Sequence, residues 1–114
     1  MKFLLSLVVF MVLLLPQTGF SSNASAGNLH TIHYMNNGIV VVYTTGTRTG
    51  NLQDCATNQP QRFAIDAKTE AGKVQLTGLL TAYTTGKPVV IIGKGDNCEC
   101  HGDTETINYF YTAD

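Results

Sequence analysis

The chain has 114 residues, with seven Lys and Arg against eight Asp and Glu, and a formal net charge of −1 at pH 7. No cluster of Lys and Arg occurs, which argues against nucleic acid as a partner and against a polybasic membrane-binding patch. The length fits one small domain.

The first 26 residues have the layout of a secretory signal peptide. Lys2 supplies a positive charge, residues 3–15 are an almost unbroken apolar run, and Ala24-Ser25-Ala26 offers small residues at positions −3 and −1 of a cleavage site. About 13 apolar residues are too few to span a bilayer as a helix. We therefore expect an exported protein, periplasmic or secreted and without stable membrane insertion, whose domain covers residues 27–114. Removing 26 of the 114 residues leaves 88, with a formal charge of −2.

Three β-strands are predicted before any helix. Residues 29–35 alternate loosely, and residues 39–45 are β-branched or aromatic throughout. The Asn37-Gly38 pair between them is a strong hairpin signal, because both residues tolerate positive φ. Residues 46–60 are polar and are predicted to form a long loop. Residues 62–66 alternate with a period of two, which predicts a third strand.

The period then changes to that of a helix over residues 70–84. Thr69 is a candidate N-cap, and Gly86 stands where a left-handed C-terminal residue is favoured. Gly78 would allow close packing against a sheet. Four apolar side chains at i, i+3, i+4 and i+7 form one helix face, which places them in the core: Leu76, Leu79, Leu80 and Tyr83.

Two further strands complete the domain. Residues 89–92 are an apolar run between Pro88 and Gly93, which predicts a buried strand, and residues 104–111 alternate. The resulting order, β-β-β-α-β-β, is that of an OB-fold. The predicted fold is mainly β with one helix, arranged as a five-stranded small barrel.

The three cysteines, Cys55, Cys98 and Cys100, all follow the leader. An exported domain favours a disulfide, and Cys55 could pair with either Cys98 or Cys100. The remaining cysteine would be a free thiol or an intermolecular link.

Several segments resemble small exported bacterial proteins similar to the B subunit of subtilase cytotoxin. They are Cys55, residues 62–66, 71–73, 79–83, 86–89 and 93–95, Cys98 and residues 103–105. The resemblance implies an OB-fold that binds glycans, assembles as a homopentamer and accompanies a toxic partner. It also favours the Cys55–Cys98 disulfide. Cys100 departs from the family's pattern, and no sugar-binding residue of the toxin is carried over to this chain.

Residue types suited to metal or redox chemistry occur together at Cys98, Cys100, His101 and Asp103, to which His30 and His33 could add nitrogen ligands. A disulfide beside a polar loop is the simpler interpretation in an oxidising compartment. Asp103 and Glu105 could be paired carboxylates on one strand face, as glycosidases use. Without a cleft to serve, they more simply form a solvated strand end. No serine follows the predicted cleavage site. We expect neither catalysis nor a cofactor.

Tyrosines are the better indication of function. Tyr34, Tyr43, Tyr109 and Tyr111 lie on predicted strands, and the last two share one strand face. OB-folds bind ligands on strand faces, and sugars suit aromatic surfaces with polar neighbours. The alternatives for these four side chains are barrel packing and an oligomer interface. The sequence thus favours a non-catalytic glycan-binding module over a periplasmic interaction or inhibitor protein.

Overall fold

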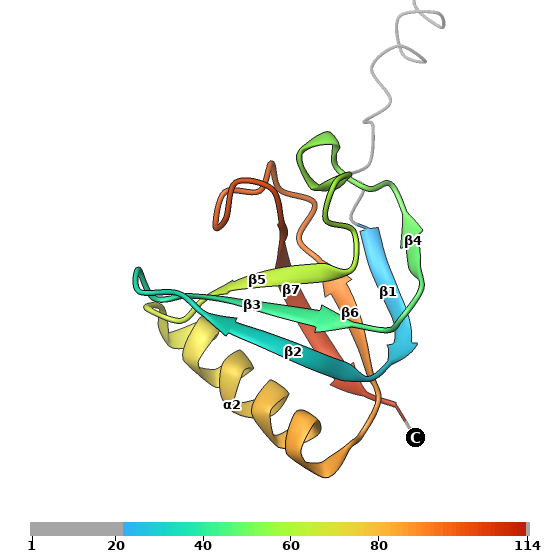
Figure 1. Ribbon diagram of the computed structural model, residues 1–114, viewed down its shortest axis with the longest axis vertical. Helices are drawn as coiled ribbons and strands as arrows, with labels where there is room; N and C mark the ends of the chain where they lie inside the picture. Colours follow the sequence, from blue (N-terminus) through green and yellow to red (C-terminus); the bar gives the residue numbers. More distant parts are fainter. Residues whose placement is uncertain (1–21, 114) are drawn as a thin grey trace, which may run out of the picture.

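Residues 22–113, which the computed structural model describes, form seven strands, one α-helix and one short 3-10 helix (Figure 1). The predicted signal peptide lies outside these residues up to position 21. The elements are β1 (Ser22–Gly27), β2 (Leu29–Tyr34), β3 (Ile39–Thr44), β4 (Arg48–Gly50), η1 (Asp54–Ala56), β5 (Arg62–Asp66), α2 (Glu70–Thr85), β6 (Val89–Gly93) and β7 (Glu105–Thr112).

The strands form one sheet in the order β2-β3-β5-β7-β6-β1-β4. All neighbours are antiparallel except β5 and β7, which are parallel. Figure 1 shows β2, β3 and β5 crossing steeply over β1, β6 and β7, with α2 beside β2. The mainly β architecture with one helix is as predicted.

The predicted local elements are confirmed where local signals are strong. The hairpin of β2 and β3 turns at Gly38, whose φ is 84°. The side chain of Thr69 accepts a hydrogen bond from Gly72 N at 2.9 Å and begins α2. Gly86, with φ 68°, ends the helix one residue later than predicted. These caps satisfy backbone groups that the helix ends would otherwise leave unpaired.

The helix packs on the sheet through small and aliphatic residues. A β-carbon at Gly78 would lie 2.9 Å from Cζ of Phe110, so the predicted close approach is confirmed. Leu79 and Ala82 are buried, but Tyr83 is 45% exposed, and its predicted core position is wrong. The buried stripe is centred on Leu79, which leaves Tyr83 at the edge of the contact.

The predicted five-stranded barrel differs from the observed sheet in both the number and the order of its strands. Strands β1 and β4 were not predicted. β1 lies in a Ser- and Ala-rich segment that lacks β-branched residues and was assigned to the leader. β4 is a three-residue strand inside the predicted loop of residues 46–60. Neither segment has a sequence pattern typical of a strand. Each adopts the strand conformation through pairing with distant residues, which the local sequence does not reveal.

A close crossing of two backbones lies at the corner between these strands. Only Asn28 separates β1 from β2, and residues 45–47 separate β3 from β4. A β-carbon at Gly27 would overlap the backbone nitrogen of Gly46, and one at Gly46 would overlap the carbonyl oxygen of Ser25. Neither Gly27 nor Gly46 has a positive φ, so the backbone conformation does not require glycine there. Glycine is required at both positions because a β-carbon has no space.

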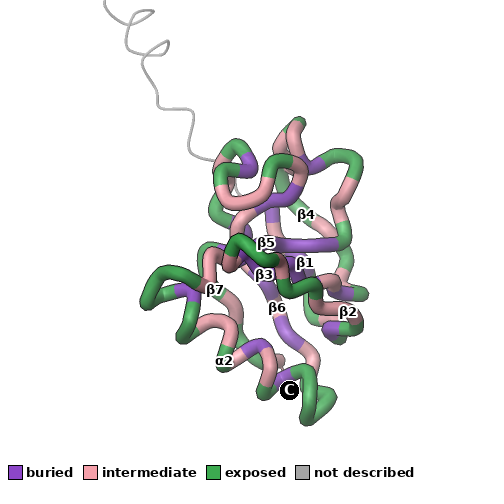
Figure 2. Tube along the Cα trace, turned by 60° about the vertical axis from the view of Figure 1, so that its left-hand side comes forward, coloured by how far each residue is buried: buried purple, intermediate pink, exposed green. Residues whose placement is uncertain are grey.

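Two apolar clusters hold the domain together. The larger lies between α2 and the inner face of the sheet, and its members include Ala24, Val42, Phe63, Leu79 and Ile91. The smaller, formed by Ile39, Val41 and Ala64, covers the opposite face of β3 and β5. The strands β3 and β5 are therefore buried on both sides (Figure 2).

A disulfide joins the loop between β4 and β5 to the loop between β6 and β7. It links Cys55 with Cys98, 43 residues apart, as the resemblance favoured, and Cys100 is a free cysteine. Within residues 22–113, the structure contains no helix whose length and apolar character would let it cross a membrane.

Candidate functional site

The four tyrosines predicted to bind a ligand lie in separate parts of the sheet. Tyr109 and Tyr111 project from β7, each 52% exposed. Tyr34, on the edge strand β2, is 62% exposed, whereas Tyr43 on β3 is half-buried. Tyr34 and Tyr43 also lie on opposite faces, because Tyr34 pairs with Val40 of the inner face. The structure brings together only the pair on β7.

Tyr109 and Tyr111 form an exposed patch with residues of β6. In the antiparallel register, Ile92 lies opposite Tyr109 and Val90 lies opposite Tyr111. Directly opposite residues share a face of the sheet, and positions i and i+2 lie about 7 Å apart along a strand. Val90 and Ile92 are half-buried, although a buried strand was predicted. We call these four residues the tyrosine face.

Polar side chains extend the tyrosine face across two more strands. Asn23 of β1 lies opposite Ile92, and Thr49 of β4 lies opposite Asn23. One row thus runs across four strands, from Tyr109 through Ile92 and Asn23 to Thr49. Asn23 is half-buried, and its amide oxygen is inaccessible to solvent and has no hydrogen-bond partner among the described residues, whereas Thr49 is exposed. This row places the hydroxyl of Thr49 and the partly exposed side chain of Asn23 beside an aromatic and aliphatic surface.

Sequence reasoning missed the polar half of this row. Asn23 was assigned to the leader, and Thr49 to a loop. The alternation of residues 22–27 is visible only in their burial, since Ser22 and Ala24 are buried while their neighbours are not. No motif in the sequence marks either residue.

Tyr43 belongs to a second group of side chains, on the outer face of β2, β3 and β5. Its ring centroid lies 5.7 Å from that of His30 and 5.3 Å from that of His33. Its hydroxyl accepts a hydrogen bond from Nη1 of Arg62 at 3.0 Å. Because its ring is flanked and its hydroxyl is used, Tyr43 offers less free aromatic surface than Tyr109.

Arg62 connects this group to the loop before β7. Its Nη2 donates to Oδ1 of Asp103 at 2.6 Å, and its Nε donates to the hydroxyl of Thr104 at 2.8 Å. Burial acts to raise the pKa of Asp103, but hydrogen bonds from Thr104 and Arg62 and the charge of Arg62 hold it below its usual range. His101 Nε2 lies 3.7 Å from the same carboxylate oxygen. The arrangement is an ion-pair network that fixes the loop.

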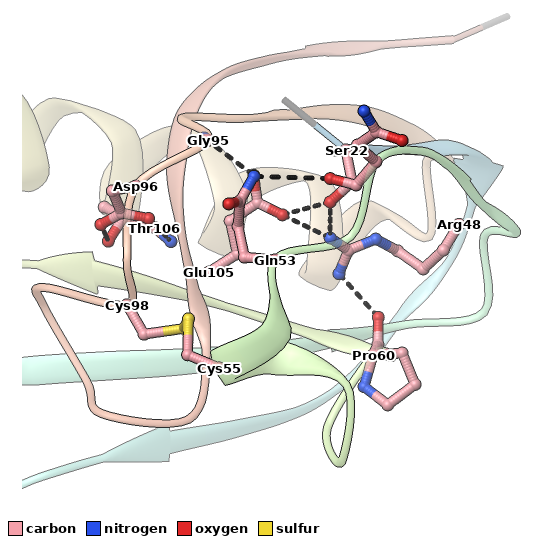
Figure 3. Close-up of polar contacts among 11 residues, drawn as sticks. Ser22, Arg48, Gln53, Cys55, Pro60, Gly95, Asp96, Cys98, Glu105 and Thr106 are labelled. Atoms are coloured by element: carbon pink, nitrogen blue, oxygen red, sulfur yellow. Dashed lines mark hydrogen bonds and ion pairs between the residues drawn. A yellow bond between two sulfur atoms is a disulfide. The ribbon is translucent and has the colours of Figure 1, made fainter. Parts of the chain in front are cut away.

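Glu105 does not pair with Asp103 as a second carboxylate. The side chain of Glu105 is fully buried, and its Oε1 lies 2.5 Å from Nη2 of Arg48 (Figure 3). The hydroxyl of Ser22 bonds both groups, and Gly95 N donates to the other carboxylate oxygen at 2.9 Å. Asp103, in contrast, is half-exposed on Arg62. Glu105 lies at the start of β7 on a buried arginine, whereas Asp103 lies in the preceding loop on a different arginine, which does not suit the glycosidase arrangement.

Arg48 is held over the apolar core by this pairing. Its guanidinium carbon lies 4.2 Å from the ring centroid of Phe63, and Nη1 donates to the carbonyl of Pro60 at 2.7 Å. Burial lowers the pKa of Arg48 more than the charge and hydrogen bond of Glu105 raise it. Arginine nonetheless stays protonated in proteins. The Arg48–Glu105 pair is therefore a buried ion pair that closes one end of the core.

Cys100 lies beside a polar cavity of about 410 Å³. The cavity is bounded by the start of α2, residues 94–100 and the middle of β7, and its lining includes Asp66, Lys94, Asp96, Glu99 and Asn108. Burial raises the pKa of the Cys100 thiol to about 11, with smaller contributions from Asp66 and Asp96. The thiol is protonated at neutral pH and packs against the smaller apolar cluster.

The raised pKa predicts slow alkylation of Cys100. About three pH units below its pKa, near pH 8, only about one thiol in a thousand is ionised, so iodoacetamide should react roughly 100-fold more slowly than with an ordinary thiol. The rate should rise about tenfold per pH unit and level off near pH 11. In denaturant, the alkylation rate of the same protein should level off near pH 9, the ordinary pKa of a cysteine thiol. A plateau at that pH in the folded protein would contradict the proposed burial of the thiol.

The predicted metal-type cluster is not assembled around a common centre. Cys98 is bonded to Cys55, and no group of three or more His, Cys, Asp or Glu side chains able to hold a metal ion occurs within residues 22–113. His30 and His33 lie against the ring of Tyr43.

Three comparisons, with protein-family models, with curated proteins and with solved structures, find no match to this chain.

Proposed function

We propose that the protein is an exported, non-catalytic binding module and that its tyrosine face binds a glycan. The observation that carries the proposal is the pair of half-exposed tyrosines, Tyr109 and Tyr111, side by side on β7. A large exposed apolar side chain has no role in the core, and two adjacent ones indicate a contact surface. Barrel packing does not account for them, since half of each side chain is open to solvent.

The chemistry beside the tyrosines favours a sugar. A pyranose ring has an apolar C–H face and a rim of hydroxyls, so it fits an aromatic surface flanked by hydrogen-bonding groups. Tyr109 and Ile92 supply the apolar surface, and the same row continues through the half-buried Asn23, whose amide oxygen is inaccessible, to the exposed hydroxyl of Thr49. These groups are uncharged, which suits a neutral portion of a glycan.

The OB-fold interpretation remains part of this proposal. We treat β1 and β2 as one bent strand, and β3 and β4 as a second that follows the same bend. The support is that only Asn28 interrupts the first, and that β1 pairs with β4 as β2 pairs with β3. With β5, β6 and β7, this gives five strands, with α2 between the third and fourth. That path is the one expected from the resemblance to subtilase cytotoxin B subunits.

A glycan array followed by calorimetry tests the proposed function. We expect the wild-type protein to bind a reproducible set of glycans, and Tyr109→Ala and Tyr111→Ala each to weaken that binding by about 2- to 10-fold, since an aromatic contact contributes roughly 0.5–1.5 kcal/mol. Tyr83→Ala is the matched control, because Tyr83 is 45% exposed but lies on α2. Equal effects at all three positions, or silence across a broad array, would overturn the proposal.

A protein partner is the second candidate, because the tyrosine face also contains the aliphatic side chains of Val90 and Ile92. Protein interfaces are enriched in tyrosine at their centre. The partner would be a second copy of this chain, as in the homopentamer that the resemblance implies, or a protein that the module inhibits or anchors. Light scattering separates these outcomes: a pentamer that Tyr109→Ala disrupts would assign the tyrosine face to assembly rather than to sugar.

A further inference from the structure

We propose that the leader is removed between Ser21 and Ser22, so that residues 22–26 remain in the exported protein. The proposal rests on the proposed export, but concerns a different bond from the one after Ala26 that the small residues Ala24 and Ala26 suggest. Three independent features of the described residues require β1 in the mature fold.

The first feature is the position of β1 within the sheet. It pairs with β6 on one side and with β4 on the other, and among residues 22–113 β1 is the only strand with which β4 pairs. Ser22 and Ala24 are fully buried, and Ala24 belongs to the larger apolar cluster. Cleavage after Ala26 would leave β6 with a bare edge and β4 without its partner.

The second feature is the buried ion pair. The hydroxyl of Ser22 forms hydrogen bonds with both Glu105 and Arg48 (Figure 3). Cleavage after Ala26 would remove Ser22 and leave the fully buried carboxylate of Glu105 without this partner. An unsatisfied buried polar group is strongly unfavourable. Ser22 can complete this cluster only if it remains in the folded, exported chain.

The third feature is the pair of glycines that make room for β1. A β-carbon at Gly46 would overlap the carbonyl oxygen of Ser25, and one at Gly93 would overlap the carbonyl oxygen of Ser22. Neither glycine has a positive φ, so neither is required by its own backbone conformation. Glu105 also limits the space at Gly93, but Gly46 is constrained by Ser25 and by its close approach to Gly27 and Thr44. Gly46 and Gly93 thus leave space for backbone atoms of β1 that cleavage after Ala26 would remove.

The sequence offers a suitable bond immediately before β1. Cleavage after Ser21 places Ser21 at position −1 and Gly19 at −3, both small, six residues beyond the apolar run that ends at Leu15. A signal peptidase would hydrolyse this peptide bond with one water. The water oxygen joins the carbonyl carbon of Ser21, which becomes the carboxylate of the leader, and the nitrogen of Ser22 becomes the new amino terminus.

The experiment is to express the full chain in a bacterium with a periplasm, purify the exported protein, and determine its intact mass and amino-terminal sequence. We expect a chain of 93 residues that begins Ser-Asn-Ala, which is what remains when 21 of the 114 residues are removed. A chain that begins at Gly27, or anywhere else after Ser22, overturns the inference but leaves export intact. A chain that keeps the whole leader overturns both.

Two matched variants locate the bond. Ser21→Leu places a large residue at position −1 of the proposed bond, and we expect uncleaved precursor to accumulate at least 10-fold in the membrane fraction. Ala26→Leu places the same residue at −1 of the other site, at an exposed position, and should leave the mature mass changed only by the substitution itself. Accumulation of precursor in Ala26→Leu, with normal processing of Ser21→Leu, would overturn the proposal. Processing precedes folding, so neither result depends on the stability of the variant.

Discussion

Replacing Glu105 with alanine should lower the free energy of unfolding by about 3–5 kcal/mol, because it leaves the Arg48 guanidinium charged and buried without a counter-ion. The side chain of Glu105 is fully buried and that of Arg48 is 11% exposed, so solvent cannot compensate for the lost partner. Ser22 and Gly95 would also lose a hydrogen-bond acceptor. Urea unfolding followed by circular dichroism measures the change.

Glu70→Ala is the matched control for Glu105→Ala. Glu70 also pairs with a cation, Lys73 at 3.4 Å, but its side chain is 92% exposed. Exposed pairs contribute little to stability, so this variant should unfold at nearly the wild-type urea concentration. Similar losses in the two variants would show that the Arg48–Glu105 pair is exposed to solvent, contrary to the structure.

Removing the Cys55–Cys98 disulfide should have a comparable effect. In the chain-entropy account, closing a loop of 43 residues stabilises the folded state by about 4 kcal/mol, because the unfolded chain has fewer conformations. We expect Cys55→Ser to lose roughly this amount, and reductant to destabilise the wild-type protein by the same amount. A small domain has little stability to spare, so partial unfolding near 37 °C is the expected result.

Cys100→Ser provides the control for the disulfide. Cys100 carries a free thiol that packs at the edge of the smaller cluster, so its replacement should leave the response to reductant unchanged. Titration of the unfolded wild-type protein should give one free thiol per chain. Three free thiols before reduction, or no effect of reductant on stability, would contradict the disulfide. A dimer that reductant dissociates would identify Cys100 as an intermolecular link.

The two stabilising features act on the same part of the molecule. The disulfide joins Cys55 to Cys98, and Gly95, in the same loop as Cys98, donates to Glu105. Asp96 in that loop also accepts a hydrogen bond from the hydroxyl of Thr106 at 2.5 Å (Figure 3). The loop of residues 94–104 is therefore joined to η1 by the disulfide and to the start of β7 by hydrogen bonds. Tyr109 and Tyr111 lie further along β7, whose first residues are held in place by these contacts.

The tyrosine face depends on an irregularity in the same strand. The register between β6 and β7 shifts between Ile92 and Gly93, so that Gly93 lies opposite Ile107 while Ile92 lies opposite Tyr109. Asn108 is the additional residue at this bulge. If β7 were regular, with Asn108 paired in it, a strict period of two from buried Ile107 would place Tyr109 and Tyr111 on the buried face. The bulge at Asn108 thus turns the two tyrosines outward.

The sequence by itself determined the elements whose signals are local. The Asn37-Gly38 turn, the Thr69 N-cap and the Gly86 C-cap act over a few residues, and the hairpin and helix they define are present within one residue of their predicted ends. The cysteines, in a chain predicted to be exported, predicted a disulfide that includes Cys55, and the proposed resemblance favoured Cys98 as its partner.

Tertiary structure alone decided which distant residues meet. Strand β1 has no strand-like composition, and its Ser22 acquires a role only because Arg48 and Glu105, 26 and 83 residues away, converge on it. The four tyrosines separate because the bulge in β7 and the pairing of β2 with β3 set their faces, which an alternation pattern does not specify. Local backbone preference fixes turns and caps, whereas burial and long-range pairing fix the register, and register decides which side chains face solvent together.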